Sequence, residues 1–149
     1  MYQSTISKEI KMSGIGLYSG KQVNMKMLPA PIDNGVTFIV KGHKIQASYE
    51  NVKETLRRTI IGNNSVEIHT VEHLMSALYL CNITNIIIEM DGFEPPIMDG
   101  SAIEFVDCMN NAGIKKQDKD IRPIIIDIKV SYELPSKDSY VTALPYDGF

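Results

Sequence analysis

The sequence predicts an α+β fold, a two-layer sandwich in which a mixed β-sheet packs against two helices. Residues 5–40 alternate polar and apolar side chains between turn signals, which is typical of strands with one solvated face. Residues 70–81 and 101–112 instead repeat apolar side chains with helical spacing. A β-branched run at residues 85–90 separates the two helices and is typical of a buried strand.

The first forty residues predict three strands. They are expected to cover residues 5–12, 22–27 and 36–40. Gly14, Gly16 and Gly20 give a flexible connection between the first two, and the loop over residues 29–35 ends in Asn-Gly, a strong turn signal. Residues 45–48 and 59–62 could be further strands, joined by a charged stretch.

The first helix is predicted over residues 70–81, with Thr70 as its N-cap and Asn82 as its stop signal. Its apolar stripe follows the spacing i, i+3, i+4 and i+7 and consists of Val71, Leu74, Met75 and Leu78. The strand that follows, at residues 85–90, is expected to be buried on both faces.

The second helix is predicted over residues 101–112. Ser101 and Glu104 have the spacing of a capping box, in which each side chain bonds a backbone N–H at the helix start. Gly113 occupies the position of a C-terminal capping glycine. A long loop over residues 91–100, stiffened by two prolines, connects this helix to the preceding strand.

The C-terminal segment predicts the start of a second, incomplete domain over residues 121–149, after a first domain over residues 1–120. The charge run at residues 115–120 is interpreted as a solvated linker. Two strand-like segments follow at residues 124–132 and 139–144, around a turn at 135–138. The apolar side chains of the first segment are expected to be exposed and to favour dimerisation or aggregation. These are Ile124, Ile126, Ile128 and Val130.

Composition excludes several classes of protein. The chain has 149 residues, 44% of them hydrophobic, and a net charge of −3, which argues against a sequence-independent nucleic-acid binder. It has neither an apolar run of bilayer-spanning length nor the pattern of a signal peptide at its N-terminus. Cys81 and Cys108 are expected to be buried free thiols in a reducing compartment, which predicts a cytoplasmic protein.

The run His69-Thr70-Val71-Glu72-His73 is the chemically most informative part of the sequence. His69 and His73 are four residues apart, as in helical zinc motifs, but His69 precedes the predicted cap. Glu72 and His73 lie in the first turn, where one side chain could bind a metal while the other acts as a general base. From these residues alone, a surface Glu-His pair without function is the favoured interpretation, and a metal site is the alternative.

Several motifs together resemble one enzyme family. TVEHL at residues 70–74 is followed by PIMDGSA at residues 96–102, and GIGLYSGK at residues 14–21 precedes both. PYDGF closes the chain at residues 145–149. In order and spacing these segments resemble the zinc-dependent UDP-3-O-acyl-N-acetylglucosamine deacetylases of lipid A biosynthesis, and the similarity covers essentially the whole chain.

The resemblance implies a site and a reaction. It implies that His73 is a zinc ligand, that Glu72 is the general base, and that the reaction removes the N-acetyl group of a UDP-linked acylated amino sugar. The PIMDGSA loop would be structural. In this family a second domain of similar build supplies the other zinc ligands and a general acid. No histidine follows His73 here, so the 149-residue chain alone is expected to be inactive.

Two departures from the family pattern bear on the substrate. Tyr18 stands where the family commonly has histidine. Arg57 and Arg58 stand in a segment that usually reads like TxLCT, where they could contact an anionic diphosphate or form a solvated loop. Two functions are therefore expected. The first is the N-terminal part of the deacetylase, and the alternative is a catalytically silent truncated domain that only folds or binds a partner.

Overall fold

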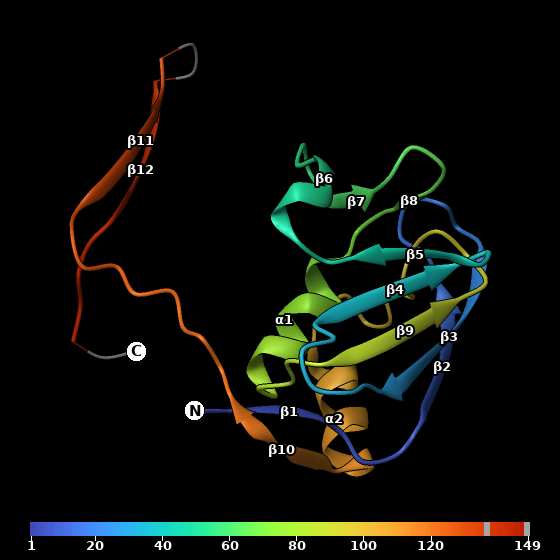
Figure 1. Ribbon diagram of the computed structural model, residues 1–149. Helices are drawn as coiled ribbons and strands as arrows, with labels where there is room; N and C mark the ends of the chain where they lie inside the picture. The colour runs from blue at the N-terminus through green and yellow to red at the C-terminus, as the bar shows by residue number, and fades with distance from the viewer. Residues whose placement is uncertain (136–137, 148–149) are drawn as a thin grey trace.

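The computed structural model describes residues 1–135 and 138–147 and confirms the α+β class. Its main sheet has five strands in the order β2-β3-β9-β4-β5, all antiparallel except for the parallel pair β4 and β9 (Figure 1). The strands are β2 (Ile10–Ile15), β3 (Gln22–Pro29), β4 (Val36–Val40), β5 (His43–Gln46) and β9 (Ile86–Met90). Two helices cover one face of this sheet, α1 (Glu72–Leu80) and α2 (Ile103–Ala112).

Alternation along the strands separates the two faces of the sheet. In β3, Val23, Met25 and Met27 are buried while Asn24 and Lys26 are exposed. The expectation that residues 85–90 are buried on both faces is wrong, because every second residue of β9 is only half-buried. Helices cover only one face of this sheet, so its other face keeps contact with water.

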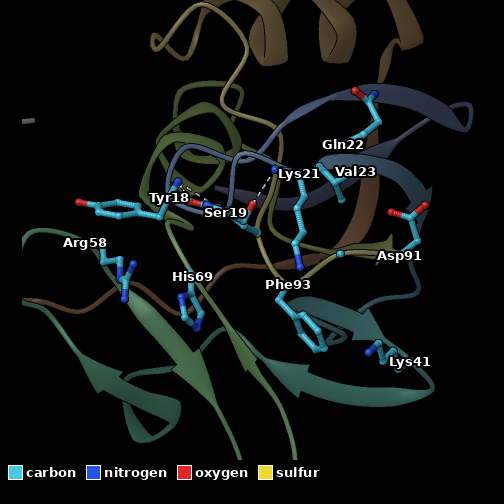
Figure 2. Close-up of a pocket in the computed structure, with 12 residues that line it drawn as sticks. Tyr18, Ser19, Lys21, Gln22, Val23, Lys41, Arg58, His69, Asp91 and Phe93 are labelled. Atoms are coloured by element: carbon cyan, nitrogen blue, oxygen red, sulfur yellow. Dashed lines mark hydrogen bonds between the residues drawn. The ribbon is translucent and has the colours of Figure 1, made fainter.

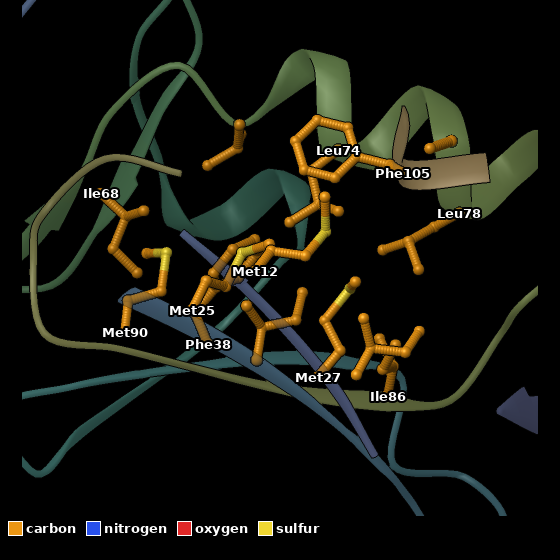
Figure 3. Packing of buried hydrophobic residues seen from close by; sticks show 14 of the residues in the cluster. Met12, Met25, Met27, Phe38, Ile68, Leu74, Leu78, Ile86, Met90 and Phe105 are labelled. Atoms are coloured by element: carbon orange, nitrogen blue, oxygen red, sulfur yellow. The ribbon is translucent and has the colours of Figure 1, made fainter. Parts of the chain in front are cut away.

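The core lies between the sheet and the helices. The helices contribute Leu74, Ala77, Leu78, Phe105 and Met109, all at most 1% exposed. The sheet contributes several methionines, whose flexible side chains fill irregular space between the layers (Figure 3). These are Met12, Met25, Met27 and Met90.

The C-terminal ends of both helices agree with the sequence prediction, whereas the N-terminal ends do not. Asn82 and Gly113 have positive φ after α1 and α2, as expected of residues that stop a helix. At the N-termini the capping positions are Val71 and Ala102, neither with a side-chain cap bond, so the prediction of Thr70 as a cap is wrong.

The predicted capping box of the second helix does not form either. Ser101 donates its N–H and its hydroxyl to the Asp99 carboxylate, and its Oγ accepts the N–H of Ile103 at 3.2 Å. A local turn thus starts the helix in place of the reciprocal bonds between Ser101 and Glu104.

Two segments pair differently from the sequence prediction. The single strand expected over residues 5–12 is split into β1 (Tyr2–Ile6) and β2, because the chain turns at residues 7–9. The charge run is strand β10 (Ile114–Asp120), not a linker, and it pairs antiparallel with β1. The charged side chains gave no sign of this strand, since it is stabilised by backbone bonds to a partner more than a hundred residues away.

A small three-stranded sheet lies beside the main one. It comprises β6 (Val52–Glu54), β7 (Ile60–Gly62) and β8 (Glu67–Ile68), preceded by the short helix η1 (Tyr49–Asn51). β7 confirms the strand expected at residues 59–62. Ile60 and Ile61 are buried, so this sheet is attached to the core through its middle strand.

The C-terminal hairpin projects from the rest of the chain (Figure 1). It pairs β11 (Val130–Leu134) with β12 (Ser139–Ala143). The strand predicted over residues 124–132 is only partly correct, since the paired strand begins at Val130 and residues 121–129 belong to no strand. Of the predicted turn at 135–138, residues 136–137 lie outside the described residues. No helix in the described part of the chain is long and apolar enough to cross a membrane.

Candidate active site

The start of α1 is fixed by an unusual backbone conformation at Thr70. Thr70 has φ +54°, a left-handed conformation that β-branched residues rarely adopt. Its hydroxyl donates to Glu94 Oε1 at 2.7 Å, and the neighbouring His69 N–H donates to the Phe93 carbonyl at 2.9 Å. These bonds hold the strained turn, which in turn orients the first residues of α1.

Glu72 is half-buried and is held by the backbone of Thr59, which directly precedes strand β7. Its Oε2 accepts the N–H of Thr59 at 3.0 Å, and the Val71 N–H donates to the Thr59 carbonyl at 3.4 Å. Within the described residues Oε1 accepts no hydrogen bond. One oxygen therefore anchors the carboxylate while the other remains available to accept a proton.

His73 is half-buried, and its imidazole has no hydrogen-bond or ion-pair partner among residues 1–135 and 138–147. It follows Glu72 in the first turn of α1, so the two side chains diverge by ~100° around the helix axis. An imidazole without a partner offers a nitrogen lone pair to an incoming metal ion. The donor chemistry at His73 thus fits one ligand of a zinc site.

Glu94 is the buried acid of the region, only 4% exposed. Besides Thr70, it accepts the backbone N–H groups of Tyr18 and Ser19, each at 3.1 Å. Burial by itself raises the pKa of this carboxyl, but the hydrogen bonds from Thr70, Ser19 and Tyr18 outweigh it, so the pKa lies below its ordinary value. Glu94 therefore ties the loop at residues 16–21 to the start of α1.

Gly16 shows how closely that loop approaches Glu94. A Cβ at this position would collide with Ser19 Oγ and with Glu94 Oε2. Only glycine therefore fits here without movement of the buried carboxylate.

A pocket of about 480 Å³ lies between this loop, the segments that flank the small sheet at Arg58 and His69, and the loop at residues 91–94 (Figure 2). Arg58 and His69 line it, and the Arg58 guanidinium lies 4.4 Å from the centre of the Tyr18 ring. Arg57 does not line it, has φ +61°, and accepts the Tyr18 hydroxyl on its backbone carbonyl at 3.1 Å.

The structure thus brings together some of the residues selected from the sequence and not others. Arg58 and His69 share the pocket, whereas Glu72 and His73 do not line it. Glu72 is nevertheless adjacent, because Thr59, which it binds, follows Arg58 directly. Sequence reasoning missed Glu94, whose position in a loop between Phe93 and two prolines carries no periodic signal. Among the described residues no group of three or more His, Cys, Asp or Glu side chains is placed to hold a metal ion.

Comparison with known proteins connects this geometry to a family. The family model described as UDP-3-O-acyl N-acetylglycosamine deacetylase matches residues 3–149. A UDP-3-O-acyl-N-acetylglucosamine deacetylase of Thermodesulfovibrio yellowstonii is 41% identical over 99% of this chain and 51% of its own length. The enzyme of the same name from Ruthia magnifica is 40% identical over 99% of this chain and 49% of its own.

A longer relative is also similar. The "bifunctional enzyme LpxC/FabZ" of Chlorobaculum tepidum is 37% identical over 100% of this chain and 33% of its own length. The chain therefore spans about half the length of the two deacetylases and about a third of the bifunctional protein. The match of the family model over nearly every residue is decisive, and the chain belongs to the UDP-3-O-acyl N-acetylglycosamine deacetylase family.

Proposed function

We propose that this chain is the N-terminal part of a zinc-dependent deacetylase of lipid A biosynthesis that acts in the cytoplasm. Its substrate would be UDP-3-O-(3-hydroxyacyl)-N-acetylglucosamine, from which hydrolysis removes the N-acetyl group. The observation that carries the proposal is the start of α1, where a carboxylate anchored through one oxygen precedes an imidazole without a partner. The names of the relatives support the choice of substrate.

In this proposal Glu72 and His73 have different tasks. His73 is one ligand of the zinc ion, which when bound polarises a carbonyl and lowers the pKa of water. Glu72 takes the proton of the attacking water on its free Oε1, while the bond from Thr59 to Oε2 keeps the carboxylate in place. General-base catalysis of this kind typically contributes ~10²–10⁴-fold to the rate.

Arg58 and Arg57 are proposed to contact the anionic diphosphate of the substrate. Arg58 has the better position, since its guanidinium lines the pocket and is supported by the Tyr18 ring. A planar guanidinium can bind phosphate oxygens with two parallel hydrogen bonds. Arg57 is exposed in the same segment and would contact the diphosphate from outside the pocket.

The rest of the site is proposed to come from outside these 149 residues. Residues 1–120 would form the first domain and residues 121–149 the start of a second. A catalytic zinc site takes three protein ligands, of which this chain supplies His73. We therefore expect the 149-residue chain alone to show neither stoichiometric zinc after dialysis nor turnover, and a chain that shows both would refute this division of the site.

A chimera tests the proposal. It carries these 149 residues followed by the remainder of the Thermodesulfovibrio yellowstonii relative, which the chain matches over 99% of its length. We expect it to deacetylate the UDP-linked substrate and to hold zinc. His73→Ala should reduce the zinc content, measured by elemental analysis, whereas His43→Ala in the exposed part of β5 should not. Equal loss in both variants, or none in His73→Ala, would remove the ligand assignment.

A further inference from the structure

The turn before α1 is held on one side by the loop at residues 91–94. The His69 N–H donates to the Phe93 carbonyl at 2.9 Å, and the Thr70 hydroxyl donates to Glu94 Oε1 at 2.7 Å. Thr70 is only 3% exposed, so its hydroxyl has little access to water as an alternative partner. Since α1 has no side-chain cap bond of its own, these two bonds fix where its first turn begins.

Thr59 holds the same turn on the other side. Its carbonyl accepts the Val71 N–H at 3.4 Å, and its N–H donates to Glu72 Oε2 at 3.0 Å. Val71 and Glu72 follow Thr70 directly, so a change in the backbone conformation of Thr70 moves both groups relative to Thr59. The Thr59 N–H therefore reports the position of the Glu72 carboxylate.

Glu94 itself has little freedom to move. Its Oε1 also accepts the Tyr18 N–H at 3.1 Å, and its Oε2 accepts the Ser19 N–H at 3.1 Å. The next two residues, 95 and 96, are buried prolines, whose rings fix the backbone φ directly after Glu94. A change in the loop at residues 16–21 that moves the two N–H groups therefore also moves the carboxylate that they bind.

We propose that Glu94 is a positioning residue, which couples the conformation of the loop at residues 16–21 to Glu72 through the Thr70 hydroxyl. Within the described residues, the hydrogen-bond partners of the carboxylate are donors, including two backbone N–H groups of the loop, and both of its oxygens are used. A glutamine would present its amide nitrogen to at least one of these donors, so the coupling requires a carboxylate. The role of Glu72 as a base rests on the proposed function, whereas the coupling itself does not.

Hydrogen exchange of the 149-residue chain, followed for each amide by NMR, tests the coupling without any turnover. Thr70→Val keeps the shape of the side chain but removes the donor, so the Thr59 amide should exchange about tenfold faster, as the loss of one hydrogen bond implies. The amides of β9 in the core should exchange as in the parent. Thr70→Ser keeps the hydroxyl and should keep Thr59 protected, whereas Glu94→Gln should accelerate its exchange as Thr70→Val does.

Thr37→Val is the matched control, because Thr37 is also a buried threonine and its hydroxyl bonds the Gln46 side chain at 3.0 Å in the main sheet. It should leave the exchange of the Thr59 amide unchanged. Exchange of Thr59 at the parent rate in Thr70→Val, or equal acceleration by Thr37→Val, would overturn the proposal. Faster exchange of β9 together with Thr59 would show a general loss of stability and would overturn it as well.

The chimera with the longer relative gives the catalytic readout. There Thr70→Val should lower kcat about tenfold while KM and the zinc content stay at the level of the parent, and Thr70→Ser should keep the parent kcat. A Thr70→Val chimera that loses zinc, or that changes only in KM, would contradict a role in positioning Glu72. A parent chimera without turnover would contradict the proposed function, whereas the exchange of Thr59 would still decide the coupling.

Discussion

Two isoleucine-rich runs of this chain differ in how far their side chains are buried. In β9, Ile86 and Ile88 are 0% exposed. In the segment before the hairpin, Ile124 is 91% exposed and Ile128 is 67% exposed. The two runs have similar composition, so composition does not explain the difference.

Neighbouring strands and helices explain it. β9 is the central strand of the main sheet, paired with β3 on one side and β4 on the other, and its inward face packs below the helices. Residues 121–129 have no strand partner, and the hairpin projects from the body. Apolar side chains contribute to stability only where other elements remove them from water, so the fold of this chain depends on the body up to β10.

The largest expected effect is the difference in unfolding free energy between variants of the two runs. Ile88→Ala should lower the free energy of unfolding by ~2–5 kcal/mol, because it leaves a cavity in the centre of the core. Ile124→Ala should change it by less than ~0.5 kcal/mol. Urea denaturation followed by circular dichroism measures both. Similar losses in the two variants would mean that residues near Ile124 are packed.

The second largest expected effect is the difference in stability loss between variants of two glutamates. Glu94 is buried in the body and Glu133 is exposed on β11. Glu94→Gln replaces one acceptor oxygen by an amide donor and should cost ~1–3 kcal/mol at neutral pH. Glu133→Gln should cost nothing measurable. Equal effects would show that the hydrogen bonds to Glu94 contribute no stability.

The stabilisation by Glu94 is also expected to depend on pH. The pKa of Glu94 is lowered in the folded chain, so its stabilisation is present above the unfolded-state pKa of ~4.3 and is lost as the pH falls through the folded value. The stability difference between the parent and Glu94→Gln should therefore be full at neutral pH and should shrink below about pH 4. A difference that is constant down to about pH 2 would contradict the lowered pKa.

The smallest expected effect concerns self-association through the exposed run. Ile128→Ser should weaken any dimer about tenfold, equivalent to about 1.4 kcal/mol, because it removes an apolar side chain from the proposed contact. Sedimentation velocity at several concentrations measures it. Ile32→Ser, an exposed apolar position on the body, is the control and should leave association unchanged. A monomeric parent chain at all concentrations would contradict the dimer predicted from the sequence.

The elements that could be predicted from the sequence are those whose signal is local. Both helices and the strands β3, β4, β7 and β9 follow from periodicity, and Asn82 and Gly113 mark helix ends as expected. Strand β10 could not be predicted, since its residues carry charges and its structure depends on β1 at the opposite end of the chain. Thr70 has the right residue type for a cap, but its hydroxyl is used by Glu94.

The candidate site was predictable only in part. The TVEHL run led to Glu72 and His73 through resemblance, and their roles stay a prediction. The pocket residues Lys21, Lys41 and Phe93 come from three separate loops and strands, and no spacing in the sequence connects them. Glu94 was missed for the same reason, because its partners lie more than twenty residues away along the chain.

The most direct test of this account is the turnover number of Glu72→Gln in the chimera with the longer relative. Glutamine keeps the shape and can still accept the Thr59 N–H, but it cannot take a proton. We predict that kcat falls by ~10²–10⁴-fold while zinc content stays at the level of the parent. Glu54→Gln on the exposed strand β6 should retain full activity. A Glu72→Gln variant as active as the parent would contradict the assignment of Glu72 as the general base.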